Sequence, residues 1–114
     1  MANTIIKSPG VVSLIAIDSD WNFTASYPGE ATKGIAVAFI AFAPAAANDR
    51  CVIKHAAEGG AVIFDSGLMA AGGTALQTTV IYYGGMRIKP FLDVSAGAFA
   101  ATATVIIKLA GGCE

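Results

Sequence analysis

Apolar and polar residues alternate with a period of two along much of this chain. The clearest case is the segment from 101 to 109, where Ala, Ala, Val, Ile and Leu alternate with Thr, Thr, Ile and Lys. Successive side chains of a β-strand point to opposite faces, so this pattern predicts an amphipathic strand. Similar runs, rich in β-branched and aromatic residues, predict further strands at 11–17, 21–25, 34–42, 51–55, 61–65, 77–83 and 86–93.

Turn-forming residues separate these segments. Gly84-Gly85 is predicted to be the two-residue turn of a hairpin that joins 77–83 to 86–93. Pro90 lacks an N–H, which predicts that its strand lies at an edge or a bulge. Loops are expected at 18–20, 26–30, 45–49 (or one helical turn there), 67–74 and 95–98.

The alanine-rich segment 34–42 also fits a helix, because alanine favours helices. Its β-branched and aromatic residues, with Pro44 just beyond, favour a strand. About eight short strands separated by turns predict an all-β chain, a single-domain antiparallel β-sandwich of jelly-roll type. The expected division is an N-terminal arm at 1–10, the sandwich at 11–110 and a tail at 111–114.

The predicted hairpin between Asn48 and Ser66 is apolar on both faces. With His55 opposite Ala61, one face carries Cys51, Ile53, His55, Ala61, Ile63 and Asp65, and the other carries Val52, Lys54, Val62 and Phe64. Antiparallel sheets usually have one face in water, so this pair should be covered on both faces. The second layer of the domain would be one cover, and a neighbouring subunit could be the other.

Composition strengthens the expectation of a neighbour. Hydrophobic residues make up 55% of the chain and charged residues 13%, well below the roughly 25% charged residues of an average domain. A monomer would expose much of this apolar surface, so we expect a homo-oligomer or a member of a lattice.

The charge balance argues against two classes of partner. The net charge is −1 and the sequence has no basic cluster, so neither nucleic acid nor a membrane is an expected partner. The longest apolar run, Ile35 to Ala47, is too short to span a bilayer, and the N-terminus lacks the pattern of a signal peptide. A soluble protein that is not secreted is expected.

Chemistry-bearing residues are few. Cys51 and Cys113 could form a disulfide, but a core thiol and a tail thiol are the preferred interpretation. Asp18 and Asp20 have the spacing of a calcium or acid–base pair, yet the other ligands of a calcium loop are missing, which favours a solvated turn. His55 has no matching nucleophile, so a structural role is expected.

Aromatic and basic residues supply the remaining candidates. Trp21 with Tyr82 or Tyr83 could form a platform for a sugar ring, whereas packing in the core or between subunits is the simpler interpretation. For Arg50 and Arg87, structural ion pairs or interface contacts are expected, and the candidate carboxylates are Asp49, Asp65 and Asp93.

Several segments together resemble small structural proteins of tailed bacteriophages. They are V-S-L-I-A-I-D-S-D-W (12 to 21), A-A-A-N-D-R-C-V-I-K-H (45 to 55), V-I-F-D-S (62 to 66) and Y-G-G-M-R-I-K-P-F-L-D (83 to 93). The resemblance implies a virion protein made in the host cytoplasm: a capsid decoration or cement-like protein, a tail component or a fibre. These motifs concern packing and turns, so no site residues follow from them.

The sequence therefore favours a non-enzymatic virion structural protein, without cofactor or metal, whose partners are itself and other virion proteins. Aromatic residues and arginine are enriched at interfaces, so the expected interface residues are Trp21, Phe64, Tyr82, Tyr83 and Arg87. The alternative is a carbohydrate-binding module that uses Trp21 with Tyr82 or Tyr83 to bind a receptor. An enzyme ranks third, since no nucleophile with a base, metal cluster or cofactor loop can be assembled.

Overall fold

The fold is antiparallel and all-β. The computed structural model describes residues 4–15, 17–44, 49–57, 59–66, 79–99 and 103–110. The strands are β1 (Thr4–Ser8), β2 (Val11–Ile15), β3 (Trp21–Asn22), β4 (Ile35–Ala43), β5 (Val52–His55), β6 (Val62–Asp65), β7 (Thr79–Ile88), β8 (Pro90–Leu92) and β9 (Thr104–Leu109). Three short 3₁₀ helices accompany them: η1 (Phe23–Ala25), η2 (Pro28–Glu30) and η3 (Val94–Ala96).

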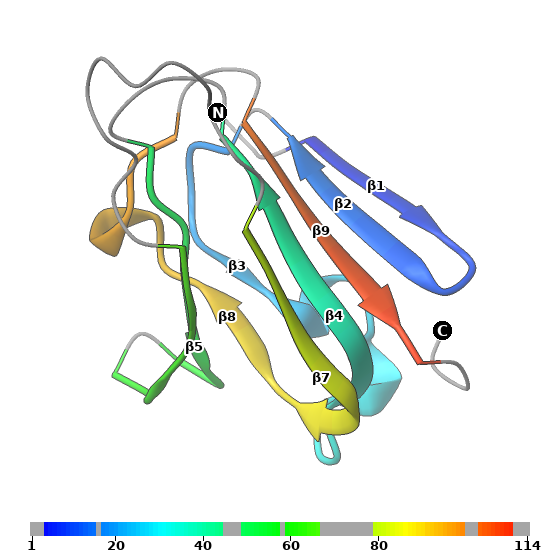
Figure 1. Ribbon diagram of the computed structural model, residues 1–114. Helices are drawn as coiled ribbons and strands as arrows, with labels where there is room; N and C mark the ends of the chain where they lie inside the picture. The colour runs from blue at the N-terminus through cyan, green and yellow to red at the C-terminus, as the bar shows by residue number, and fades with distance from the viewer. Residues whose placement is uncertain are drawn as a thin grey trace.

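The strands form two sheets packed as a sandwich (Figure 1). One sheet has five strands in the order β1-β2-β9-β4-β7, and the other has four in the order β3-β8-β5-β6. Every neighbouring pair is antiparallel. The prediction of a single-domain antiparallel sandwich is confirmed.

The order of pairing is that of a jelly roll. If the chain is folded back on itself at the β5–β6 hairpin, β4 meets β7, β3 meets β8 and β2 meets β9, and each of these pairs is present. The resulting double ribbon is wrapped so that its pairs alternate between the two sheets. The hairpin at 51–65 is therefore the tip of the roll, and β6 lies at the edge of its sheet.

The core lies between the two sheets. Every second residue of a regular strand points into it. In β9 the predicted apolar face is confirmed, because Ala103, Val105, Ile107 and Leu109 are all buried. In β2 the buried residues are Val12 and Leu14. Segments predicted at 45–48, 67–74, 77–78, 101–102 and 111–114 fall outside the described residues.

Strand β4 confirms the strand interpretation of 34–42 but corrects its faces. Strict alternation would place Ile35, Val37 and Phe39 on one side, whereas the residues of β4 in the core cluster are Ile35, Val37, Ile40 and Phe42. The register shifts between Val37 and Phe39 in both of the pairings that β4 makes. Such a bulge inserts an extra residue and exchanges the two faces beyond it. Phe39 therefore points away from the core.

The predicted hairpin turn at Gly84-Gly85 is wrong. Strand β7 runs through both glycines and stays paired with β4 on either side of them. Gly84 and Gly85 have φ of 63° and 87°, a region that favours glycine, and they form a bulge opposite the irregularity in β4. The chain changes sheets later, at Lys89. The edge or bulge predicted from Pro90 is also wrong, because β8 lies between β3 and β5; Pro90 is its first residue, where a missing N–H is tolerated.

The β5–β6 pair is confirmed, and its predicted register is partly correct. The N–H of His55 donates to the carbonyl of Ala61, as the expected pairing requires. A bulge between Ile53 and Lys54 then places Ile53 opposite Phe64, so both enter the core. The expected faces are therefore wrong beyond the bulge, because it shifts the alternation by one residue.

The segment expected as an arm contains β1, which pairs with β2 along its whole length. Pro9 and Gly10, with Gly10 at φ 79°, occupy the turn between them, and Pro-Gly suits a type II turn. The sequence signal that could have predicted this hairpin is the Pro-Gly dipeptide between two runs that contain isoleucine and valine. Lys7 ties β1 to the rest of the domain, because its ammonium donates to the Ser26 carbonyl (2.9 Å) and lies over the Tyr27 ring.

The strand expected at 21–25 is shorter than predicted. β3 ends at Asn22, and η1 follows. The Asn22 side chain causes this change, since its Oδ1 accepts a hydrogen bond from the Thr24 N–H (3.1 Å) and so caps the helical turn. Trp21 and Phe23 are both buried.

Candidate interaction surface

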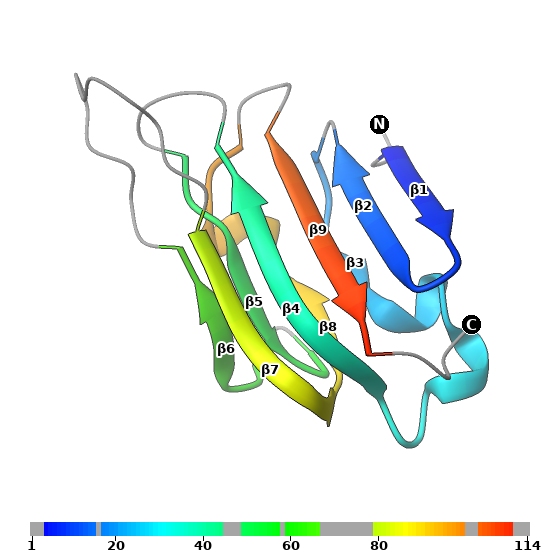
Figure 2. The same cartoon turned by 45° about the vertical axis from the view of Figure 1, so that its right-hand side comes forward.

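The five-stranded sheet has an outer face that no described strand or helix covers (Figure 2). Residues paired directly across strands point to the same side of the sheet. The rows that alternate with the core residues therefore point outward. In register from β1 to β7, these form three rows. They are Ile6-Ser13-Ile106-Ala41-Val80, Ser8-Val11-Lys108-Phe39-Tyr82 and Thr4-Ile15-Thr104-Ala43. We call this set the outer face.

The outer face is largely apolar. Ile6 is 51% exposed, Val80 39% and Tyr82 76%. Lys108 carries the one charge in the set, and its ammonium lies beside the Gly10 turn, 3.6 Å from the position that a Cβ on Gly10 would take. The charge is therefore at one end of the face, and the interior of the face has none. Antiparallel sheets normally present a polar face to water, so this face is unusual.

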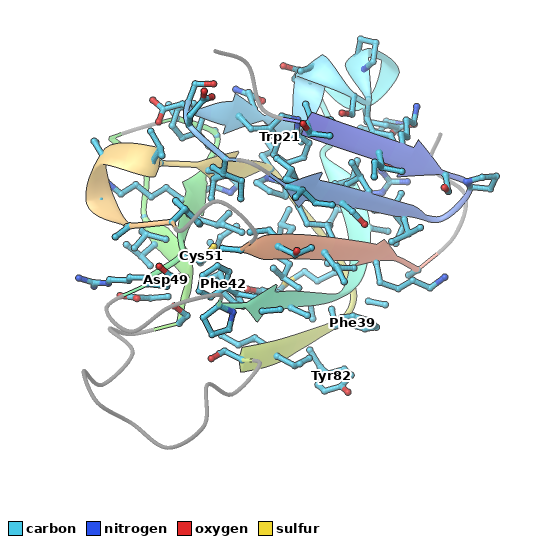
Figure 3. The ribbon with its side chains drawn as sticks, turned by 90° about the horizontal axis from the view of Figure 1, so that it is seen from above. Trp21, Phe39, Phe42, Asp49, Cys51 and Tyr82 are labelled. Carbon is cyan, nitrogen blue, oxygen red and sulfur yellow. The ribbon has the colours of Figure 1, made fainter. Side chains whose placement is uncertain are left out.

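An aromatic ridge stands on the β4–β7 side of the outer face. The rings of Phe39 and Tyr82 pair across the two strands with centroids 5.6 Å apart and an angle of 59° (Figure 3). Their neighbours along β4, Ala41 and Ala43, are small. The face thus combines a ridge of large side chains with a lower strip of small ones.

Past the bulges, Arg87 lies at the same end of the sheet as Lys108. It is paired in register with Ala36, whose carbonyl accepts from the Ala110 N–H just beyond β9. Its guanidinium donates to the Gly34 carbonyl (2.8 Å) and pairs with Glu30 (3.3 Å). An ion pair for Arg87 was expected, but Glu30 was not among the expected partners.

The other sheet carries a partly exposed ion pair, Arg50–Asp65, and a largely buried one, Lys54–Asp93. Arg50 forms a bidentate pair with Asp65, with the shorter contact at 2.6 Å, and Lys54 pairs with Asp93 at 2.8 Å. Asp65 was one of the three candidate partners of Arg50. The second apolar face expected for the β5–β6 hairpin belongs instead to the five-stranded sheet.

The five predicted interface residues separate into three groups. Trp21 and Phe64 are 3% and 1% exposed and pack in the core. Tyr83 is half-buried, and its hydroxyl donates to the Ile63 carbonyl, which ties β7 to β6. Burial, and Cys51 to a smaller extent, raise the pKa of Tyr83 to about 12, so this hydroxyl keeps its proton. Tyr82 and Arg87 remain accessible on the outer side of the five-stranded sheet.

The sugar platform, the alternative interpretation of Trp21 with Tyr82 or Tyr83, is not assembled with Trp21. Trp21 lies at the opposite end of the molecule from Tyr82 (Figure 3) and is buried. Large aromatic residues favour cores and interfaces alike, so the sequence could not separate the two. Sequence reasoning missed Ile6, Phe39, Val80 and Ile106. The signal was the apolar residue on the polar side of a predicted strand, as with Ile106 between Thr104 and Lys108.

The acidic candidates Asp20 and Asp65 have structural partners. Asp20 accepts a hydrogen bond from the Val94 N–H (2.8 Å), which anchors η3. His55 is exposed, and Asp65 pairs with Arg50 as described above. Within the described ranges, no group of three or more His, Cys, Asp or Glu could hold a metal ion. The same ranges contain no helix long and apolar enough to cross a membrane.

Cys51 is a buried free thiol, as predicted, and Cys113 lies outside the described residues. Burial is the main cause that raises the pKa of the Cys51 thiol, and the Asp65 charge adds to it. The thiolate is the reactive form, so this thiol should be inert in the folded protein.

We expect Cys51 in a Cys113→Ser variant to react with a thiol reagent such as DTNB only as fast as the protein unfolds. The measurement is the release of the coloured thiolate at neutral pH with and without urea. Addition of denaturing urea should accelerate the reaction by orders of magnitude. Rapid stoichiometric labelling of the folded variant would contradict the buried position.

A scan against protein-family models and searches of curated proteins and of solved structures found no match to this chain.

Proposed function

We propose that this chain is a non-enzymatic structural protein of a tailed-phage virion that assembles through the outer face of its five-stranded sheet. The observation that supports the proposal is the uncharged apolar interior of that face. An apolar surface of this kind is stabilised when it leaves water, and assembly is the ordinary way to cover it. The sequence resemblance to phage structural proteins supplies the setting.

The fold agrees with this role. Jelly rolls occur in viral capsid domains and also in lectins. The fold alone therefore does not separate assembly from sugar binding, and the properties of the surface must do so. A sugar site usually combines an exposed aromatic platform with polar groups, whereas the outer face has few polar groups near Tyr82. On the opposite sheet, the partly exposed Arg50–Asp65 ion pair is a polar feature suited to water.

The proposal is tested by asking whether the chain is present in particles. Virions of the phage that encodes it would be purified through a density gradient and analysed by quantitative mass spectrometry. We expect the chain to co-purify in many copies per particle. Abundance in the lysate with absence from the particles would overturn the proposal.

A further inference from the structure

We infer that the outer face binds the same face of a second copy, in a face-to-face dimer with two-fold symmetry. The inference rests on the proposed assembly role, and it names the partner and the geometry. Three observations support this geometry: the position of the Lys108 charge, the positions of large and small side chains along β4, and the position of Ile106 in the middle row of the face.

Charge selects the direction of the symmetry axis. Lys108 belongs to β9, the middle strand of the sheet, at one end of the face. An axis parallel to the strands would place the two Lys108 residues opposite each other, and like charges at an interface are unfavourable. An axis across the strands places Lys108 opposite Thr104 of the second copy, because these residues occupy the two outer rows of β9.

Side-chain size agrees with the same axis. It brings Phe39 opposite Ala43 of the second copy, since these residues occupy the two outer rows of β4. The ridge of each copy then meets the small side chain at the other end of β4. A two-fold interface must be self-complementary in this way. The axis runs along the middle row, where Ile106 meets its own copy.

The absence of charge from the interior of the face favours a second copy over a charged partner. Acidic or basic groups of a different protein would be buried there without a counter-charge, which is costly. Two identical uncharged surfaces have no such cost, and Lys108 and Arg87 stay at the rim. This is the usual arrangement of an apolar interface core with a polar rim.

The size of the face predicts a weak dimer. Strands about 4.8 Å apart and residues about 3.4 Å apart give five strands over five residues a footprint of roughly 400 Å². A standard interface buries about 800 Å² on each partner. The dimer should therefore form only at high protein concentration in solution, and additional contacts in a particle would stabilise it through multivalency.

The test uses sedimentation equilibrium of the full chain over a concentration series that reaches the millimolar range. We expect a monomer–dimer equilibrium. Ile106→Glu and Ile106→Lys should each weaken the dimer roughly tenfold or more, because each places like charges opposite one another. An equimolar mixture of the two variants should restore association, because Glu then faces Lys across the axis.

Val62→Glu is the matched control, since Val62 is 54% exposed on the other sheet and should leave the equilibrium unchanged. Circular dichroism would check that each variant folds. If the Ile106 variants do not fold, Tyr82→Ala takes their place, and it is expected to weaken the dimer. A wild-type chain that stays monomeric, a mixture that does not associate, or equal loss in Val62→Glu would overturn the inference. Such a result would not contradict the virion proposal, which is tested by mass spectrometry of the particles. Absence of the chain from particles would likewise not change the result of the sedimentation experiment.

Discussion

Replacing Trp21 with alanine is expected to lower the free energy of unfolding by roughly 3–5 kcal/mol. Trp21 is 3% exposed and belongs to the core cluster between the sheets. Its strand, β3, has only two residues and pairs with β8 at Leu92, so few other contacts hold this part of the sheet. The truncation removes a large apolar surface and leaves a cavity that the short strand cannot fill.

The measurement is urea unfolding followed by circular dichroism, because Trp21 is the only tryptophan and its fluorescence is lost in the variant. Tyr82→Ala is the control. Tyr82 is 76% exposed, so its truncation should change the stability by about 0.5 kcal/mol or less. Equal stabilities of Trp21→Ala and wild type would show that Trp21 lies on the surface, as the sugar-platform interpretation requires.

Replacing Asp93 with alanine is the second large effect, with an expected loss of about 3 kcal/mol. Asp93 is 1% exposed. One carboxylate oxygen pairs with Lys54 at 2.8 Å, and the other accepts from the N–H and hydroxyl of Ser95. The substitution leaves the mostly buried Lys54 ammonium without this partner and removes the cap of η3. Asp65→Asn is the control, since its pair with Arg50 is exposed to solvent and should contribute much less to stability.

The stabilisation by Asp93 should depend on pH. The hydrogen bond from Lys54, followed by that from Ser95, holds the pKa of Asp93 below its usual range. A carboxylate with a lowered pKa in the folded state stabilises the protein fully above its unfolded pKa of about 4, and this contribution is lost as the pH falls through the folded value. The difference in urea midpoint between wild type and Asp93→Asn should therefore be large at pH 7 and shrink at about pH 3. A constant difference would refute this assignment.

Local alternation predicted the inner residues well where a strand is regular. Ala103, Val105, Ile107 and Leu109 are buried as expected, because period two within one strand needs no information from its neighbours. Alternation failed at the bulges in β4, β5 and β7. One inserted residue exchanges the faces, and its place depends on the partner strand.

The candidate site was less predictable than the fold. The sequence indicated an excess of apolar surface and named Tyr82 and Arg87, both accessible in the structure. It could not separate them from Trp21 and Phe64, which have the same interface propensity and lie in the core. Burial depends on which layer faces a strand, and that is a property of the whole domain.

The sequence by itself determined the β class, most of the strands and the hairpin at 51–65 around which the roll is built. Only the tertiary structure decided that Gly84-Gly85 continues a strand and that the outer face exists. That face joins Ile6, Ile106 and Val80 in one row, although they are far apart in the chain. The physical reason is that alternation acts between adjacent residues, whereas register and layering arise from pairing between distant strands.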